Sequence, residues 1–177
     1  MNKYVFKRHD SIFFSFFPVE KRRLGRRLRK EAEVEHVGST AVRGLGGKNI
    51  LDIVVGIRSG RPLRIKDKLE SLGYTFLPNS GTKTRRFFTR EAVYKKKKIN
   101  IHLHLVRMNG IDWKEMVAFR DYLSDDRDAL EEYVAVKKKA AKIAKGDKKR
   151  YMELKDKFIK RAIKKAFKER GWRLRRS

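Results

Sequence analysis

The first two thirds of the chain carry the apolar patterns of β-strands. Residues 49–57 form a nearly continuous β-branched run, Asn-Ile-Leu-Asp-Ile-Val-Val-Gly-Ile, which is typical of a central strand covered on both faces. In residues 99–106 polar and apolar positions alternate, which places Asn100, His102 and His104 on one face of a strand. Shorter strands are predicted at residues 33–37, 74–77 and 86–90, with a basic turn at 95–98.

Helical spacing dominates the other segments. The basic run at residues 21–30 can form a helix that packs Leu24 and Leu28 inward and leaves its arginines outside. These arginines form either a solvated face or a ridge that contacts phosphates. A second helix is predicted after Pro62 and ends at Gly73. Three more are predicted at residues 113–123, 128–144 and 148–170.

These elements predict one α/β (α+β) domain over residues 1–177. It consists of a basic and aromatic helical segment (1–30), a sheet-rich core (31–106) and a helical part (107–177). An apolar fraction of 40% is that of a globular chain. No apolar run approaches the roughly 20 residues of a membrane span. A signal peptide has an uninterrupted apolar core, whereas charges at Lys7, Arg8 and Asp10 interrupt the first residues of this chain. We expect a cytoplasmic protein without membrane contact.

Composition excludes several kinds of chemistry. The chain has no cysteine, so disulfides, thiolate catalysis and Cys-ligated zinc are ruled out. Its heavy use of lysine, arginine and glutamate, with no glutamine, suits a thermophilic source.

The charge is strongly one-sided. Forty-eight basic residues against 21 acidic ones give a formal net charge of +27. Such an excess creates a positive field that attracts polyanions, and we expect RNA or another polyanion as a partner. The alternative is that the charge serves only solubility. Basic runs occur at residues 21–30, 95–98, 137–139 and 173–176.

A Gly-Ser turn and an aspartate are the first candidates for chemistry. Gly38-Ser39 follows a predicted strand, and backbone N–H groups at such a turn can approach phosphate oxygens closely. Asp52 lies within an apolar strand, where an unpaired carboxylate is costly to bury. A carboxylate oxygen is also a ligand that Mg²⁺ prefers. The alternative is a buried aspartate held by backbone N–H groups or an arginine.

The histidines are the second candidates. His102 and His104 can point into one cleft and bind a metal or an anion. Alternatively, they bond only to neighbouring backbone or carboxylates. His36 directly before the Val-Gly-Ser segment suggests a functional centre that includes it. No zinc motif accompanies these residues.

Several motifs together resemble the GrpB family, a group within the nucleotidyltransferase-fold superfamily. They are His36-Val-Gly-Ser-Thr-Ala-Val-Arg-Gly-Leu45, Lys48 to Ile53, Leu72-Gly-Tyr74, His102-Leu-His104 and Phe119-Arg-Asp-Tyr-Leu123. Tyr133 before Lys137 and Tyr151 before Lys155 complete the series, so the resemblance covers about residues 30–166.

The resemblance implies a mixed β-sheet flanked by helices, a nucleotide-sized cleft and metal-dependent nucleotidyl transfer. In that chemistry two or three carboxylates hold two metal ions. The second acid would fall at position 54, where this chain has Val54. Arg43 stands where the family usually has proline.

Our leading hypothesis is a protein that binds a nucleotide or a nucleic-acid end with Mg²⁺ or Mn²⁺ and transfers a nucleotidyl group from a nucleoside triphosphate. Asp52 would hold the metal, and His102 and His104 would complete the catalytic set. The phosphate ligands would be Gly38, Ser39, Lys48, Arg86 and Arg120. Two alternatives remain: a catalytically silent RNA-binding module that uses the same cleft, and an enzyme of another phosphoryl-transfer type.

Overall fold

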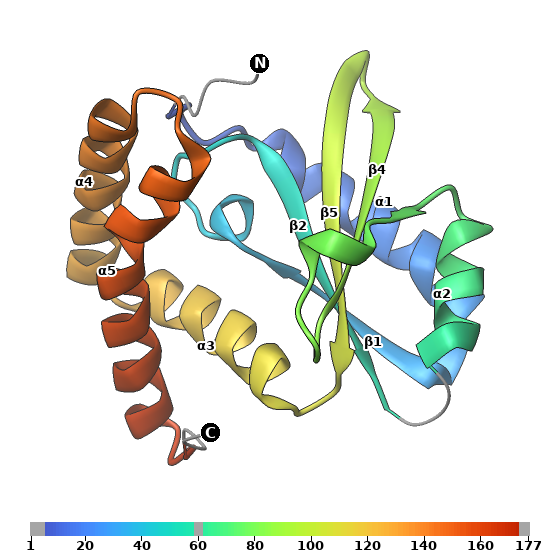
Figure 1. Ribbon diagram of the computed structural model, residues 1–177. Helices are drawn as coiled ribbons and strands as arrows, with labels where there is room; N and C mark the ends of the chain where they lie inside the picture. The colour runs from blue at the N-terminus through green and yellow to red at the C-terminus, as the bar shows by residue number, and fades with distance from the viewer. Residues whose placement is uncertain (1–5, 59–61, 174–177) are drawn as a thin grey trace.

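Five strands form one mixed β-sheet in the order β1-β2-β5-β4-β3 in the computed structural model, which describes residues 6–58 and 62–173 (Figure 1). The strands are β1 (Ala32–Val37), β2 (Ile50–Ile57), β3 (Thr75–Phe76), β4 (Arg86–Tyr94) and β5 (Lys97–Arg107). Strands β2 and β5 are parallel, whereas the other neighbouring pairs are antiparallel. The mixed sheet that the resemblance implies is confirmed.

Helices cover both faces of this sheet. Helices α1 (Ile12–Leu28) and α2 (Pro62–Glu70) pack on one face, and α3 (Ile111–Asp125) packs on the other. Helices α4 (Arg127–Ala144) and α5 (Lys148–Glu169) pack against each other and against α3 (Figure 1). Short 3₁₀ turns are η1 (Arg29–Glu31), η2 (Ser39–Ala41) and η3 (Pro78–Ser80). The predicted α/β class with a helical C-terminal third is confirmed. None of the helices in the described ranges is long and apolar enough to cross a bilayer.

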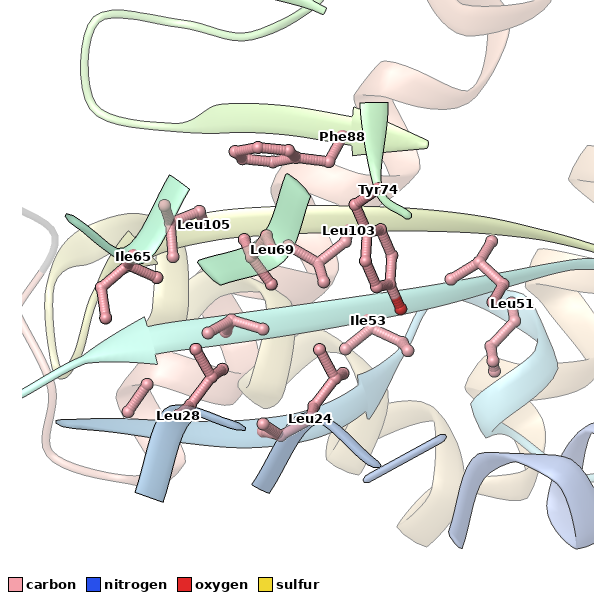
Figure 2. Packing of buried hydrophobic residues seen from close by; sticks show 14 of the residues in the cluster. Leu24, Leu28, Leu51, Ile53, Ile65, Leu69, Tyr74, Phe88, Leu103 and Leu105 are labelled. Atoms are coloured by element: carbon pink, nitrogen blue, oxygen red, sulfur yellow. The ribbon is translucent and has the colours of Figure 1, made fainter. Parts of the chain in front are cut away.

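The main apolar core lies between the sheet and helices α1 and α2. Leu24 and Leu28 of α1 are fully buried with Ile53 of β2 and Leu69 of α2, as predicted for the two leucines (Figure 2). Burying each such side chain contributes about 1.5–3 kcal/mol. Arg22 and Arg26 on the other side of α1 are exposed, as both a solvated face and a phosphate-contacting ridge require.

Some predicted boundaries differ from the observed ones. Only Lys95 and Lys96 form the turn of the β4–β5 hairpin, both with positive φ, and β5 already begins at Lys97. After α2, Gly73 adopts φ +78° and donates its N–H to the Glu70 carbonyl, which closes the helix as predicted. Of the basic run at 173–176, residues 174–176 lie outside the described residues.

A buried carboxylate connects α1 to β4 within the main core. Glu20 is 1% exposed and accepts hydrogen bonds from Tyr74 Oη (2.8 Å), Arg90 Nη1 (2.6 Å) and Arg23 Nη1 (3.1 Å). Three donors satisfy a charge that would otherwise be costly to bury.

Replacing this carboxylate should destabilise the protein. We expect Glu20→Gln to lower the free energy of unfolding by about 3 kcal/mol, because Arg90 would lose its charge partner in the core. Glu153→Gln is the control, since the exposed Glu153–Arg150 pair should contribute less than about 1 kcal/mol. Urea denaturation measures both. Equal effects would show that Glu20 is dispensable.

Candidate functional site

Strand register brings the predicted site residues into one row on the α3 face of the sheet. Asp52 of β2 is paired with Val37 of β1 on one side and with His102 of β5 on the other. His102 is in turn paired with Thr89 of β4. Paired residues in a sheet point to the same face, so these side chains are neighbours. His104, two residues further along β5, belongs to the next row on that face.

The two imidazoles converge on Asp52, as the strand pattern predicted. His102 Nδ1 lies 3.5 Å and His104 Nε2 3.9 Å from Asp52 Oδ1. The Asp52 side chain is 25% exposed. Burial acts to raise the pKa of Asp52, but the hydrogen bonding and charge of the two histidines outweigh it and hold that pKa well below its ordinary value. Asp52 is therefore a carboxylate at neutral pH.

Gly38 lies directly against the Asp52 carboxylate. A Cβ atom at residue 38 would be 2.4 Å from Asp52 Oδ2 and 2.9 Å from Asp52 Cβ. The backbone of Gly38 (φ +71°, ψ −168°) is also in a region that is essentially restricted to glycine. Ser39 follows as the first residue of η2 and lines the same cleft as Asp52. The Gly-Ser turn and the aspartate thus form one unit.

A hydrogen-bond relay behind the sheet holds this turn in place. The Thr40 hydroxyl donates to the Ile50 carbonyl, so it must accept from His36 Nε2 at 3.0 Å, which assigns the Nε2–H tautomer to His36. The His36 ring also stacks on Phe17 of α1. Burial lowers the pKa of His36 to about 4, so this ring is neutral.

This geometry corrects the expectation that His36 belongs to the functional centre. His36 is paired with Ile53, a residue of the main core, and therefore points to the face opposite Asp52. It supports the Gly-Ser turn from behind through Thr40.

Three lysines surround the carboxylate on the helical side of the cleft. Lys48 lies in the loop before β2, Lys137 in α4 and Lys155 in α5, and all three line the same cleft as Asp52. Lys137 is 4% and Lys155 8% exposed. Lys137 donates a hydrogen bond to the Gly46 carbonyl. Among the described residues, no ion pair within 4.0 Å involves Lys137 or Lys155.

The ammonium groups of these lysines lie over tyrosine rings. The Nζ atoms of Lys48 and Lys155 lie 5.6 and 4.2 Å from the centroid of the Tyr151 ring, and Lys137 Nζ lies 5.5 Å from that of Tyr133. Such cation–π contacts stabilise a partly buried cation. Lys48 and Lys155 thus share the Tyr151 ring of α5, whereas Lys137 lies over the Tyr133 ring of α4.

Burial disfavours the charged forms of all three lysines. It lowers the pKa of Lys137 to about 7, and the charges of Lys155 and Lys48 act in the same direction, against the attraction of Asp52. Burial also lowers the pKa of Lys155 to about 8, although the negative charge of Asp52 acts to raise it. Burial and then the charges of Lys155 and Lys148 lower the pKa of Lys48 to about 8. Positive charge is therefore crowded in this part of the cleft.

The cleft has a volume of about 740 Å³, which is within the range of small-ligand sites. The sheet forms its floor through Asp52, His102 and His104, and η3 supplies Asn79 and Ser80 on one side. On the other side it is lined by residues of the helical part: Phe119, Tyr133, Lys137, Lys148, Tyr151, Met152 and Lys155.

Beyond Asp52 the sheet face is closed by α3. Val54, at the position where the resemblance would place a second acid, is fully buried with Val37, Val106 and Trp113. A Cβ on Gly56, two residues further, would lie 2.6 Å from the Trp113 ring. No group of three or more His, Asp or Glu side chains in the described ranges is arranged to hold a metal ion. The residues present therefore do not fit the carboxylate clamp of two-metal nucleotidyl transfer.

Two predicted phosphate ligands lie elsewhere. Arg86 of β4 is paired with Leu105, whose side chain packs in the main core, so alternation puts Arg86 on the face opposite Asp52. Arg120 of α3 donates to Glu35 Oε2 and Asp121 Oδ1, both at 2.7 Å, and to the His36 carbonyl at 2.9 Å. These bonds connect α3 to β1. Neither arginine lines the cleft.

Lys137 and Lys155 line the cleft where Arg86 and Arg120 were expected, and the sequence contained a signal for these two lysines. Tyr133 and Lys137, like Tyr151 and Lys155, lie four residues apart on one helix, so each pair faces one direction. That spacing alone does not show that the two helices converge over Asp52.

The family follows from comparison with known proteins. The family model described as GrpB protein matches residues 5–165. The chain belongs to the GrpB family. Glutamate-rich protein GrpB of Alkalihalophilus pseudofirmus is 29% identical over 129 residues, which are 72% of this chain and 74% of that protein. The UPF0157 protein PA4798 of Pseudomonas aeruginosa is 32% identical over 134 residues, 75% of this chain but only 54% of that protein. This GrpB chain thus spans about half of the second relative.

Solved structures agree with this assignment. The crystal structure of conserved protein GrpB from Enterococcus faecalis superimposes with a TM-score of 0.79 at 26% identity, covering 94% of this chain and 99% of that one. The structure of the GLD-2/RNP-8 complex gives a TM-score of 0.52 at 14% identity, with 75% and 55% covered. The latter likeness concerns the fold alone, and it supports the predicted nucleotidyltransferase-like fold.

The contact between Gly38 and Asp52 can be tested with a second glycine as control. We expect Gly38→Ala to lower the free energy of unfolding by about 3 kcal/mol, because the added methyl group collides with the carboxylate in a strained backbone. Gly73 also has positive φ, but a Cβ there meets nothing within 4 Å. Gly73→Ala should therefore cost only about 1 kcal/mol. Equal losses in urea denaturation would mean that Asp52 moves aside freely.

Proposed function

We propose that this GrpB protein binds a nucleotide or the end of a nucleic acid through its phosphate groups, in the cleft over Asp52. The observation that carries the proposal is the convergence of Lys48, Lys137 and Lys155 with the Gly38-Ser39 turn. Ammonium groups and glycine-rich turns are common phosphate ligands in proteins. A buried ammonium group usually has a carboxylate partner, yet Lys137 and Lys155 are buried with none within 4.0 Å among the described residues.

The cleft also offers surfaces for a base or a sugar. The rings of Phe87, Phe119 and Tyr151 line it, together with the polar side chains of Asn79 and Thr89. Stacking on an aromatic ring contributes roughly 1–3 kcal/mol per base in single-stranded nucleic-acid binders. Phosphate and base can therefore be held in one cavity.

Nucleotidyl transfer with Mg²⁺ or Mn²⁺ has weaker support than binding. Asp52 is the one carboxylate among the residues that line the cleft, and Val54 closes the position of a second. We therefore derive no transfer step from this site. Incubation with a labelled nucleoside triphosphate, Mn²⁺ and RNA distinguishes an enzyme, which releases pyrophosphate, from a silent binding module.

A specific surface supports RNA binding as a second function. Lys157, Arg161, Lys164 and Lys168 are all exposed on α5. Their spacing puts them on one side of the helix, in a row about 16 Å long. Of these four, only Arg161 has an ion-pair partner among the described residues, namely Glu132. We call this row the α5 ridge. Its charge can follow a phosphate backbone.

Binding in the cleft should depend on the buried lysines. We expect calorimetric titration with ATP to show binding that weakens at least about tenfold in Lys155→Met, since a charge-assisted hydrogen bond contributes about 1.5–3 kcal/mol. Lys160→Met is the matched control, because Lys160 is exposed on the same helix and is not part of the α5 ridge. Equal affinity of both variants would exclude the cleft as the nucleotide site.

Binding of RNA should depend on salt and on the α5 ridge. With about four phosphate contacts, raising salt from 50 to 200 mM should weaken binding of single-stranded RNA roughly fiftyfold. Changing Lys157, Lys164 and Lys168 to Glu should reduce the log–log salt slope by about 2 units. The control makes the same charge change at Lys95, Lys96 and Lys98, which are exposed on the β4–β5 hairpin. Filter binding with an unchanged slope in the ridge variant would remove the ridge from the interface.

A further inference from the structure

The charge of the cleft indicates which kind of phosphate it accepts. One carboxylate, Asp52, faces the buried or half-buried Lys48, Lys137 and Lys155, and the exposed Lys148 lies at the rim. When the three inner lysines are protonated, they exceed Asp52 by two positive charges. A terminal phosphate carries −1.5 to −2 at neutral pH. An internal phosphodiester carries a single negative charge and would leave part of the excess uncompensated.

A hydroxyl donor and one of these ammonium groups meet at a single point. A Cβ on Gly47 would lie 2.7 Å from Ser39 Oγ and 2.8 Å from Lys137 Nζ. The missing side chain at Gly47 therefore lets the two donors approach each other. A phosphate oxygen can accept hydrogen bonds from both.

The same charges disfavour a divalent cation. A magnesium ion in proteins is held by carboxylates, together with substrate phosphates. Here Asp52 is the single acidic ligand, it is approached by His102 and His104, and three ammonium groups share the cleft. The lysines already supply positive charge where a metal would supply it.

We propose that the cleft recognises a terminal phosphate group, and that Lys48, Lys137 and Lys155 bind it directly in place of divalent metal ions. This inference rests on the proposed function and adds the class of ligand and the independence from metal. Mutual repulsion and burial disfavour the charged lysines, and the negative charge of a dianion among them offsets this cost by direct attraction. Asp52 then acts as a counter-charge that keeps the lysines together, and it is not a metal ligand.

The test compares ligands that differ only in their terminal phosphate. Calorimetric titration would use AMP, adenosine, and a hexaribonucleotide with either a 5′-phosphate or a 5′-hydroxyl, each in EDTA and in MgCl₂. We expect AMP and the phosphorylated oligonucleotide to bind equally well in EDTA and in MgCl₂. Removal of the phosphate should weaken each at least about tenfold. The AMP and oligonucleotide arms show whether a free nucleotide or a nucleic-acid end is preferred.

Substitution of Asp52 separates the two roles of the carboxylate. If Asp52 is a counter-charge, Asp52→Asn should bind AMP in EDTA at least as tightly as the original protein. Lys137→Met and Lys48→Met should each weaken binding about tenfold, and Lys160→Met, at an exposed α5 position outside the ridge, should leave it unchanged. Circular dichroism checks that each variant is folded. The comparison of phosphorylated and unphosphorylated ligands uses the unaltered protein, so it tests the inference even if a variant fails to fold.

The outcomes distinguish the inference from the function on which it rests. Binding that requires MgCl₂ and is lost in Asp52→Asn would overturn the inference and leave nucleotide binding intact. Equal affinity for phosphorylated and unphosphorylated ligands would also overturn it. No binding of any ligand in either buffer would overturn the proposed function itself.

Discussion

The organisation of the cleft depends on one half-buried carboxylate held against a glycine. Asp52 is on an inner strand, and Gly38 passes over it so closely that no side chain fits between them. A carboxylate in such a place must be compensated by donors or positive charge. His102 and His104 provide part of this compensation within the sheet. The lysines of the helical part provide positive charge from the other side of the cleft. Sheet and helices therefore both contribute to compensating the Asp52 carboxylate.

The packing of helix α3 limits the number of carboxylates on this face of the sheet. Trp113 covers Gly56 and packs with Val54, so the face next to Asp52 is apolar core. A carboxylate at position 54 would be buried beneath this helix without donors, at high cost. The same helix is connected to β1 by Arg120, which bonds to Glu35 and the His36 carbonyl. The packing that fixes α3 is thus incompatible with a second acid.

The sheet part of the site was predictable because strand alternation has a fixed period. Asp52 was assigned to one strand and His102 and His104 to another, and the period of two showed that the two histidines share a face. That the two strands are neighbours was not predicted and comes from the structure. The helical part was harder. The positions of Lys137 and Lys155 over Asp52 depend on how α4 and α5 dock, which no local pattern encodes. Arg86 and Arg120 were misplaced for different reasons. Arg86 lies on the face of its strand opposite Asp52, and Arg120 bonds to Glu35, a carboxylate distant in the sequence.

Membership of the GrpB family and a nucleotidyltransferase-like fold do not by themselves establish a reaction, since one fold supports many functions. What a site does follows from the groups that meet in it. In this chain one acid, two imidazoles and several ammonium groups meet where metal-dependent transfer would require two or three acids. Such a set is better suited to holding an anion than to activating a hydroxyl on a metal. The fold keeps the Gly-Ser turn and the aspartate together, and the lysines bring positive charge to the same cleft.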